Sequence, residues 1–275
     1  MDYLEAVILG VVEGLTEFLP VSSTGHLTIA EKVLGLPIDD DGVTAYTAVI
    51  QMGAIGAVIV YFFKDIVQIA SGWARGLFKP ELRGSLDHRM GWYVIVGSIP
   101  IGVVGFLGKD VVSGPLRSLW WVAAGLILWS VVMVVAERVG RQDRGEKRLS
   151  LRDAIIIGLA QCIALVPGVS RSGATISTGL LLNLDRVTAT RVSFFLSIPA
   201  LTAAGLYELK DIPGSGIGLG PTLVGTGVSF VVAYAAVAWL LRFVAGHSIV
   251  AFVPYRLALG AILVVLLASN TIAAT

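Results

Sequence analysis

The sequence predicts an all-α polytopic membrane protein, with about six transmembrane helices and two re-entrant helix–loop–helix hairpins arranged as an inverted-topology repeat. Three observations support this fold class. The 275-residue chain is 56% hydrophobic and 14% charged, with a mean hydropathy of +0.85, whereas soluble domains carry about 25% charged residues. Six apolar runs are long enough to cross a bilayer. Two further apolar stretches are interrupted in the middle by Pro, Gly and Ser residues.

The interrupted stretches are residues 3–35, broken by "LPVSSTGH", and residues 153–184, broken by "VPGVSRSG". Neither half of either stretch is long enough to span alone, and broken backbone at membrane depth is tolerated only inside protein or along a cavity. Both stretches are therefore predicted to form hairpins that enter and leave on one side. The two stretches align at a constant offset of 148 residues. The matching pairs are Ala6 and Ala154, Ile8 and Ile156, Gly10 and Gly158, Val21 and Val169, Ser22 and Ser170, and Gly25 and Gly173.

Three predicted spans follow each hairpin, at 43–63, 91–107 and 119–136, and then at 192–207, 221–241 and 249–268. An odd number of spans per copy inverts the second copy, an architecture found in many transporters. We therefore expect one integral membrane domain over 1–275, with repeat one at 1–140, a basic linker at 138–152 and repeat two at 153–275. Trp92 and Tyr255 lie near span ends, as interfacial aromatic residues do.

Lysine and arginine residues are distributed unequally over the two sides of this topology. Fifteen fall on one side and four on the other, a strong positive-inside bias. The basic side is predicted to be cytoplasmic, with both termini outside, so the first hairpin enters from outside and the second from the cytoplasm. The formal net charge of +1 gives no indication of a nucleic-acid partner. The fifteen are Lys64, Arg75, Lys79, Arg83, Arg89, Arg138, Arg141, Arg144, Lys147, Arg148, Arg152, Arg186, Arg191, Arg242 and Arg256.

The first hairpin carries unusual polar chemistry for a bilayer segment. Glu13 and Glu17 are four residues apart, so they share one helical face. Ionisable residues at membrane depth are functional candidates by default. Pro20 ends this helix, and three hydroxyls open the next one, whose free N–H groups and dipole favour an anion. His26 lies in its first turn. The hydroxyls are those of Ser22, Ser23 and Thr24.

The second hairpin repeats the anion-site plan but differs at the reactive positions. Ser23 of the first copy is matched by Arg171, and His26 by Ala174. Arginine binds phosphate through a planar, bidentate fork. Together the two tips predict a phosphoryl-transfer site with an anion clamp, a nucleophile, acid/base groups, and Glu13 and Glu17 as ligands of a divalent cation. Substrate contacts are predicted for Ser22, Thr24, Ser170, Ser172, Gly173 and Gln51.

Several roles remain open from the residues alone. Either Ser23 or His26 could be the nucleophile, and either glutamate could bind metal while the other acts as base. A purely structural ion cluster of Glu13, Glu17 and Arg171 is the alternative to catalysis. Gln51 either lines the pocket or only adds polarity to helix packing.

At these two segments the chain resembles a known family. "EGLTEFLPVSSTGH" at 13–26 and "PGVSRSGATIS" at 167–177 are similar to the two signature segments of the undecaprenyl-diphosphate phosphatase family, also called the bacitracin-resistance protein family. The similarity extends along most of the chain, including "IQMG" at 50–53 and the pattern of spans.

The resemblance implies a multi-pass hydrolase of the bacterial inner membrane with a site open to the outer face. Its substrate would be undecaprenyl diphosphate, a polyprenyl diphosphate lipid, which it converts to the monophosphate carrier of peptidoglycan synthesis, conferring bacitracin resistance. It also implies a divalent cation, Mg²⁺ or Ca²⁺. By matching motif positions, Glu13 and Glu17 would be the acidic pair, Ser23 the nucleophile, His26 an acid/base partner and Arg171 the phosphate clamp.

A lipid flippase or secondary transporter using the same midplane site is the alternative from a different class. Inverted repeats, broken helices and midplane charges are transporter features. In that case the glutamates would be an ion relay, and no phosphate would be released. Besides membrane lipids, the remaining partner left open is a second copy of the chain in a homodimer.

Overall fold

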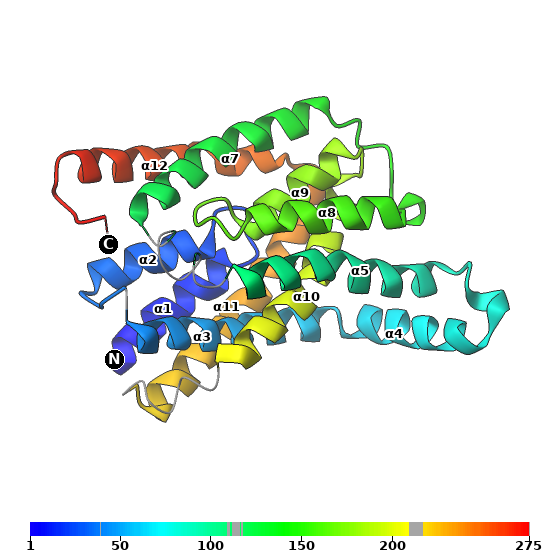
Figure 1. Cartoon of the computed structure of the whole chain (residues 1–275), viewed down its shortest axis with the longest axis horizontal. Coiled ribbons are helices and arrows are strands. Elements are labelled where there is room, and N and C mark those ends of the chain that lie inside the picture. The colour runs from blue at the N-terminus through cyan, green and yellow to red at the C-terminus, as the bar shows by residue number, and fades with distance from the viewer. Residues whose placement is uncertain (39, 109–110, 112–115, 117, 209–216, 275) are drawn as a thin grey trace.

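The protein is a bundle of α-helices in the computed structural model, which describes residues 1–38, 40–108, 111, 116, 118–208 and 217–274 (Figure 1). Six of the helices are long and apolar enough to cross a membrane, so the predicted number of spans is confirmed. Within the described residues no β-strand occurs. The six are α3 (Asp41–Tyr61), α5 (Leu86–Leu107), α7 (Leu119–Val139), α10 (Arg186–Glu208), α11 (Leu219–Gly246), and α12 (Val253–Ala268) together with the 3-10 turn Ile249–Phe252 that precedes it.

The helices extend beyond several of the predicted spans. α5 begins at Leu86, where the Ser85 hydroxyl caps it by accepting a hydrogen bond from the His88 N–H. α10 begins at Arg186 and runs through Pro199 without a break. Hydropathy reports the part of a helix suited to lipid contact, whereas capping decides where the helix starts, and the two differ by about one or two turns here.

α4 (Phe63–Phe78) is a helix that the sequence analysis did not expect. It follows α3 directly and packs against the first half of α5, projecting with it from the bundle (Figure 1). The His88 Nδ1–H donates to the Trp73 carbonyl at 3.0 Å, and a Cβ added at Gly91 would lie 2.5 Å from the Trp73 side chain. α4 is amphipathic and too polar to count as a span, which explains why a search for apolar runs omits it.

The two interrupted stretches fold as similar pairs of helices. α1 (Tyr3–Thr16) and α2 (Ser23–Val33) correspond to α8 (Leu151–Ile163) and α9 (Arg171–Leu181), and three of the four helix limits are related by the offset of 148. Ser22 and Ser170, which precede α2 and α9, both have positive φ, 78° and 75°. The local structure therefore repeats, while the re-entrant and inverted arrangement in a bilayer stays a prediction.

The two ends of the bundle differ in charge. Both chain termini lie at one end, whereas the connections 79–85 and 140–150, rich in Lys and Arg, lie at the other (Figure 1). From the sequence, Arg256 is expected among the residues of the basic side. The structure corrects this, because Arg256 is fully buried in the first turn of α12.

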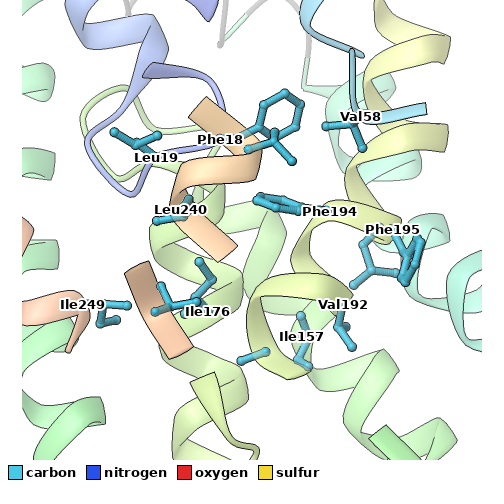
Figure 2. Close-up of a cluster of buried hydrophobic side chains, with 14 of the residues drawn as sticks. Phe18, Leu19, Val58, Ile157, Ile176, Val192, Phe194, Phe195, Leu240 and Ile249 are labelled. Atoms are coloured by element: carbon cyan, nitrogen blue, oxygen red, sulfur yellow. The ribbon is translucent and has the colours of Figure 1, made fainter. Parts of the chain in front are cut away.

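Beneath the hairpin tips lies the main apolar core (Figure 2). Phe18 follows the end of α1 and makes an edge-on contact with Phe194 of α10, with ring centroids 5.3 Å apart. Aromatic pairs in this geometry add about 0.5–1.5 kcal/mol beyond their burial. The neighbour of Glu17 is therefore anchored in the core, which limits how far that carboxylate can move.

The linker between the repeats is tied to the second hairpin by Arg144. Its guanidinium donates to both carboxylate oxygens of Asp153, at 3.2 and 2.6 Å, and to the Leu182 carbonyl at 2.7 Å. Burial alone would raise the pKa of Asp153, but hydrogen bonds from Arg144 and Ser150 outweigh burial and lower that pKa below its ordinary 3.8. The linker is thus an ordered charged contact rather than only a solvated loop.

The lowered pKa predicts how this contact responds to acid. Because the folded pKa lies below the unfolded one, the contact stabilises the protein above about pH 4, and this contribution is lost as pH falls through the folded pKa. Asp153→Asn should therefore unfold several degrees below wild type at pH 7, and the difference should shrink below about pH 4. Thermal unfolding in detergent at both pH values measures it. Asp143→Asn, at an exposed pair with Arg141, is the control, and a gap independent of pH would contradict the assignment.

Candidate active site

α1 carries the two glutamates into the interior of the bundle. Glu13 is 0% exposed and Glu17 is 5% exposed. The glycines on the same helix allow its backbone to approach α11 closely, because a Cβ at Gly10 or Gly14 would lie 2.6 Å from a backbone carbonyl oxygen of α11. The helix therefore lies directly against α11, as small residues permit in membrane proteins.

Glu17 joins the two hairpin tips through its two carboxylate oxygens. The Ser23 hydroxyl donates to Glu17 Oε2 at 2.5 Å, and Arg171 Nη2 donates to Glu17 Oε1 at 2.9 Å. Ser23 is the first residue of α2, and Arg171 is the first residue of α9. The structure thus brings together three of the predicted site residues, from hairpins that are offset by 148 residues in sequence.

Arg171 keeps unused donors at this point. Its Nε and Nη1 are buried and have no hydrogen-bond partner among the described residues, while its side chain as a whole is 12% exposed. The guanidinium carbon also lies 5.8 Å from the centroid of the Phe18 ring. Buried donors without a partner are costly, so a phosphate oxygen at this place would complete the hydrogen bonding of Arg171.

Glu13 is a buried carboxylate surrounded by Glu17, Gln51 and Arg171. Neither of its oxygens makes a hydrogen bond of ordinary geometry within the described residues, although the side chains of Gln51 and Glu17 lie within hydrogen-bonding range and Arg171 acts on it through its charge. Glu13 and the side chain of Gln51 offer the oxygen ligands that Mg²⁺ and Ca²⁺ prefer. In the described part of the chain, no three His, Cys, Asp or Glu side chains lie close enough together to hold a metal ion by themselves. The residues therefore fit a cation only if substrate phosphate oxygens complete its coordination, as is common for Mg²⁺.

His26 has a partner that the sequence analysis did not identify. Its Nδ1 lies 2.7 Å from the Ser22 carbonyl oxygen and its Nε2 lies 2.5 Å from the Tyr255 hydroxyl of α12. A carbonyl only accepts, so Nδ1 carries the proton, and in the neutral ring Nε2 accepts from the Tyr255 O–H. Tyr255 was expected only as an interfacial aromatic residue, and its hydroxyl instead reaches the predicted site.

The remaining predicted hydroxyls connect the two tips. Ser22 Oγ accepts from the Gly168 N–H at 3.1 Å, and the Ser172 hydroxyl donates to the Leu19 carbonyl at 2.8 Å. Ser170 caps α9 by accepting from the Gly173 N–H at 3.1 Å. Substrate contact by these groups and by the exposed Thr24 stays a prediction.

Arg256 is the second arginine at the tips, and the sequence analysis assigned it no part in the site. Its guanidinium donates to the carbonyls of Pro20 and Gly168, one in each tip, at 3.0 and 2.9 Å. An arginine inside an apolar run is the signal that could have identified it, because such residues face the protein interior.

Known proteins resemble this chain over nearly its full length. Residues 6–262 match the family described as "Bacitracin resistance protein BacA". Undecaprenyl-diphosphatase 1 of Streptomyces avermitilis is 57% identical over 98% of this chain and 97% of its own length. Undecaprenyl-diphosphatase of Acidothermus cellulolyticus is 56% identical over 99% of both chains. Undecaprenyl-diphosphatase of Mycobacterium sp. strain KMS is 51% identical over the whole of both chains.

Proposed function

Because this chain belongs to the bacitracin resistance protein BacA family, we propose that it hydrolyses undecaprenyl diphosphate to undecaprenyl phosphate and inorganic phosphate. The observation that carries the proposal is the shared carboxylate of Glu17, which contacts the Ser23 hydroxyl and Arg171 at once. Phosphoryl transfer needs a nucleophile, a base and a cation within reach of one phosphorus atom, and this contact provides all three. The product is the lipid carrier for peptidoglycan synthesis, and its recycling confers bacitracin resistance.

In the proposed mechanism Ser23 is the nucleophile and Glu17 is its base. Glu17 takes the hydroxyl proton while Ser23 Oγ attacks the terminal phosphorus, and the bond from that phosphorus to the bridging oxygen breaks. Undecaprenyl phosphate leaves with the electron pair, and Ser23 carries the phosphoryl group. Water then attacks this phosphoserine and gives a proton to His26 Nε2, from which the Tyr255 hydroxyl turns away. The bond from phosphorus to Ser23 Oγ breaks, Glu17 returns its proton to Ser23 Oγ, inorganic phosphate leaves, and His26 releases its proton to solvent.

Charge stabilisation comes from the second tip and from the residues around Glu13. The unused Nε and Nη1 of Arg171 donate to oxygens of the transferring group, which is usually the largest contribution to such catalysis. Glu13, with the Gln51 side chain, would hold the divalent cation, Mg²⁺ or Ca²⁺. When bound, that cation supplies positive charge against the diphosphate. Glu17 is occupied by Ser23 and Arg171, so Glu13 is the better candidate of the two as ligand.

The test is release of phosphate from undecaprenyl diphosphate by the purified protein, with and without EDTA. We expect release that EDTA abolishes and added Mg²⁺ or Ca²⁺ restores. Undecaprenyl phosphate, which lacks the anhydride bond, is the control substrate and should not be cleaved. Folded protein that releases no phosphate with either metal would contradict the proposal, and lipid movement in liposomes would then test transport.

The proposed orientation places the basic end of the bundle in the cytoplasm of a bacterial inner membrane. Both termini are then outside, and the hairpin tips open to the outer face. The bias of Lys and Arg toward one end supports this orientation. Labelling of single cysteines at residues 2 and 145, in a Cys162→Ser background, tests it in intact cells. Labelling at 2 but not at 145 is expected.

Tyr255→Phe should lower kcat by roughly three- to tenfold. The change removes the hydrogen bond to His26 Nε2, and one such bond contributes about 0.5–1.5 kcal/mol. Phosphate release at saturating substrate is the measurement. Tyr234→Phe, an exposed ring of α11 in contact with Tyr61, is the matched control and should retain wild-type kcat. Equal rates for Tyr255→Phe and wild type would show that the hydroxyl has no part in the reaction.

A further inference from the structure

A single guanidinium holds equivalent positions of the two hairpin tips. Arg256 contacts the carbonyls of Pro20 and Gly168, and these residues are related by the 148-residue offset of the repeat. Each of them lies three residues before the first residue of the following half-helix, Ser23 in one tip and Arg171 in the other. Arg256 therefore grips the same point of each tip, immediately before the two groups that meet at Glu17.

The other contacts of Arg256 fix this grip to the scaffold. Nε donates to the Ser130 hydroxyl of α7 at 3.1 Å, and Nη2 also lies 3.2 Å from the carbonyl oxygens of Gly125 and Val169. α7 is a long span without an interruption. Arg256 thus connects the two tips to the long helix α7 as well as to each other.

Arg256 holds its charge without an anion. The side chain is 0% exposed, and no carboxylate among the described residues forms an ion pair with it. An isolated charge in the interior is expensive unless dipoles surround it, and here backbone carbonyls do so. Three of them belong to the tips, where the interrupted helices leave carbonyl oxygens free of intrahelical bonds.

From these contacts we propose that Arg256 is a positioning residue of the active site. It holds the Ser23 and Arg171 backbones at the separation in which both side chains reach Glu17. The inference rests on the proposed function for its catalytic consequence, but the grip on the tips is a separate physical claim. A planar fork is needed for it, because one lysine ammonium cannot span both carbonyls and Ser130.

The first arm of the test is the activity of Arg256→Lys per folded molecule. This substitution keeps the positive charge but removes the planar guanidinium. It should lower kcat by about a hundredfold, the scale expected when catalytic groups shift by about 1 Å. Ser130→Ala removes one contact of Arg256 with α7, leaves those to the Gly125 and Leu126 carbonyls and to both tips, and should stay within about threefold of wild type. Arg256→Lys with kcat within threefold of wild type would overturn the proposal.

The second arm does not depend on activity. Hydrogen exchange followed by mass spectrometry should show faster exchange in Arg256→Lys for peptides covering 17–24 and 165–172, with unchanged exchange in α5. Increased exchange spread evenly over the chain would show a merely structural role and overturn the proposal. If wild type releases no phosphate, the proposed function fails while this arm still decides the role of Arg256.

A third arm covers the case in which Arg256→Lys does not fold. Wild type alone, in increasing denaturant, should lose protection of both tip peptides at the same concentration, because Arg256 binds both tips in addition to the direct bonds of Ser22 and Ser172 between them. Ser172→Ala, which removes the direct bond from one tip to the Leu19 carbonyl of the other, should lower that concentration for both peptides together. Loss of protection at two separate concentrations would contradict a common clamp.

Discussion

Ser23→Ala is expected to reduce phosphate release by on the order of 10⁴-fold or more, the scale of losing a nucleophile. The reason is the 2.5 Å hydrogen bond from the Ser23 hydroxyl to Glu17, which directs the hydroxyl proton at the carboxylate that must accept it. Removing the hydroxyl leaves no atom at this place to take the phosphoryl group. Single-turnover assays with terminally ³²P-labelled lipid measure the effect, and wild type should also form labelled protein that Ser23→Ala does not.

His26→Ala is the comparison that separates the two candidate nucleophiles. In the structure His26 Nε2 faces Tyr255 rather than Ser23, so we assign His26 as a base and not as the nucleophile. Removing this base should lower the rate of phosphate release by about 10²–10⁴-fold. Labelled protein should still form in His26→Ala and should accumulate, because its hydrolysis is slowed. If His26→Ala forms no labelled protein while Ser23→Ala retains activity, the imidazole is the nucleophile and the assignment of Ser23 is wrong.

Arg171→Ala is expected to lower kcat by at least about 10²–10³-fold, which is the effect of removing one preorganised donor from a site of this kind. Arg171 supplies two donors without a partner as well as a charge, so the loss should exceed that floor. Arg171→Lys keeps the charge but not the fork, and should recover only part of the activity. Initial rates over a range of lipid concentrations give kcat and KM for each variant.

The control for Arg171 is an arginine with the same charge and no contact with the tips. Arg141 lies in the linker with a side chain 72% exposed, and Arg141→Ala should leave kcat unchanged. Near-wild-type kcat for folded Arg171→Ala would mean that the contact between Arg171 and Glu17 is only structural. The structural ion cluster considered from the sequence would then be the correct interpretation.

The candidate site was largely predictable because its signals are local. Two carboxylates four residues apart, a proline, and hydroxyls opening a helix are all within "EGLTEFLPVSSTGH". The offset between the hairpins then indicated that Arg171 stands where the first copy has Ser23. Polar side chains at membrane depth need partners inside the protein. Arg171 in the second hairpin was therefore a natural ion-pair partner for the glutamates of the first.

What was not predictable depends on contacts between segments distant in sequence. The position of Arg256 inside an apolar run indicates that it faces the interior, but the sequence does not show that its partners are the carbonyls of both tips. Tyr255 at a span end is typical of an interfacial residue. α4 was missed for a different reason, since an amphipathic helix has no long apolar run. In each case the deciding information is the surface against which the residue packs.

The bond between Glu17 and Arg171 spans 154 residues, and this separation has a consequence for biogenesis. At a translation rate of about 5–20 residues per second, roughly 10–30 s pass between synthesis of the two partners. During that interval the first hairpin has two glutamates and no arginine to neutralise them. Glu17 therefore gains its charge partner only after the second hairpin has been made, so the site is complete only when both halves of the chain are in place.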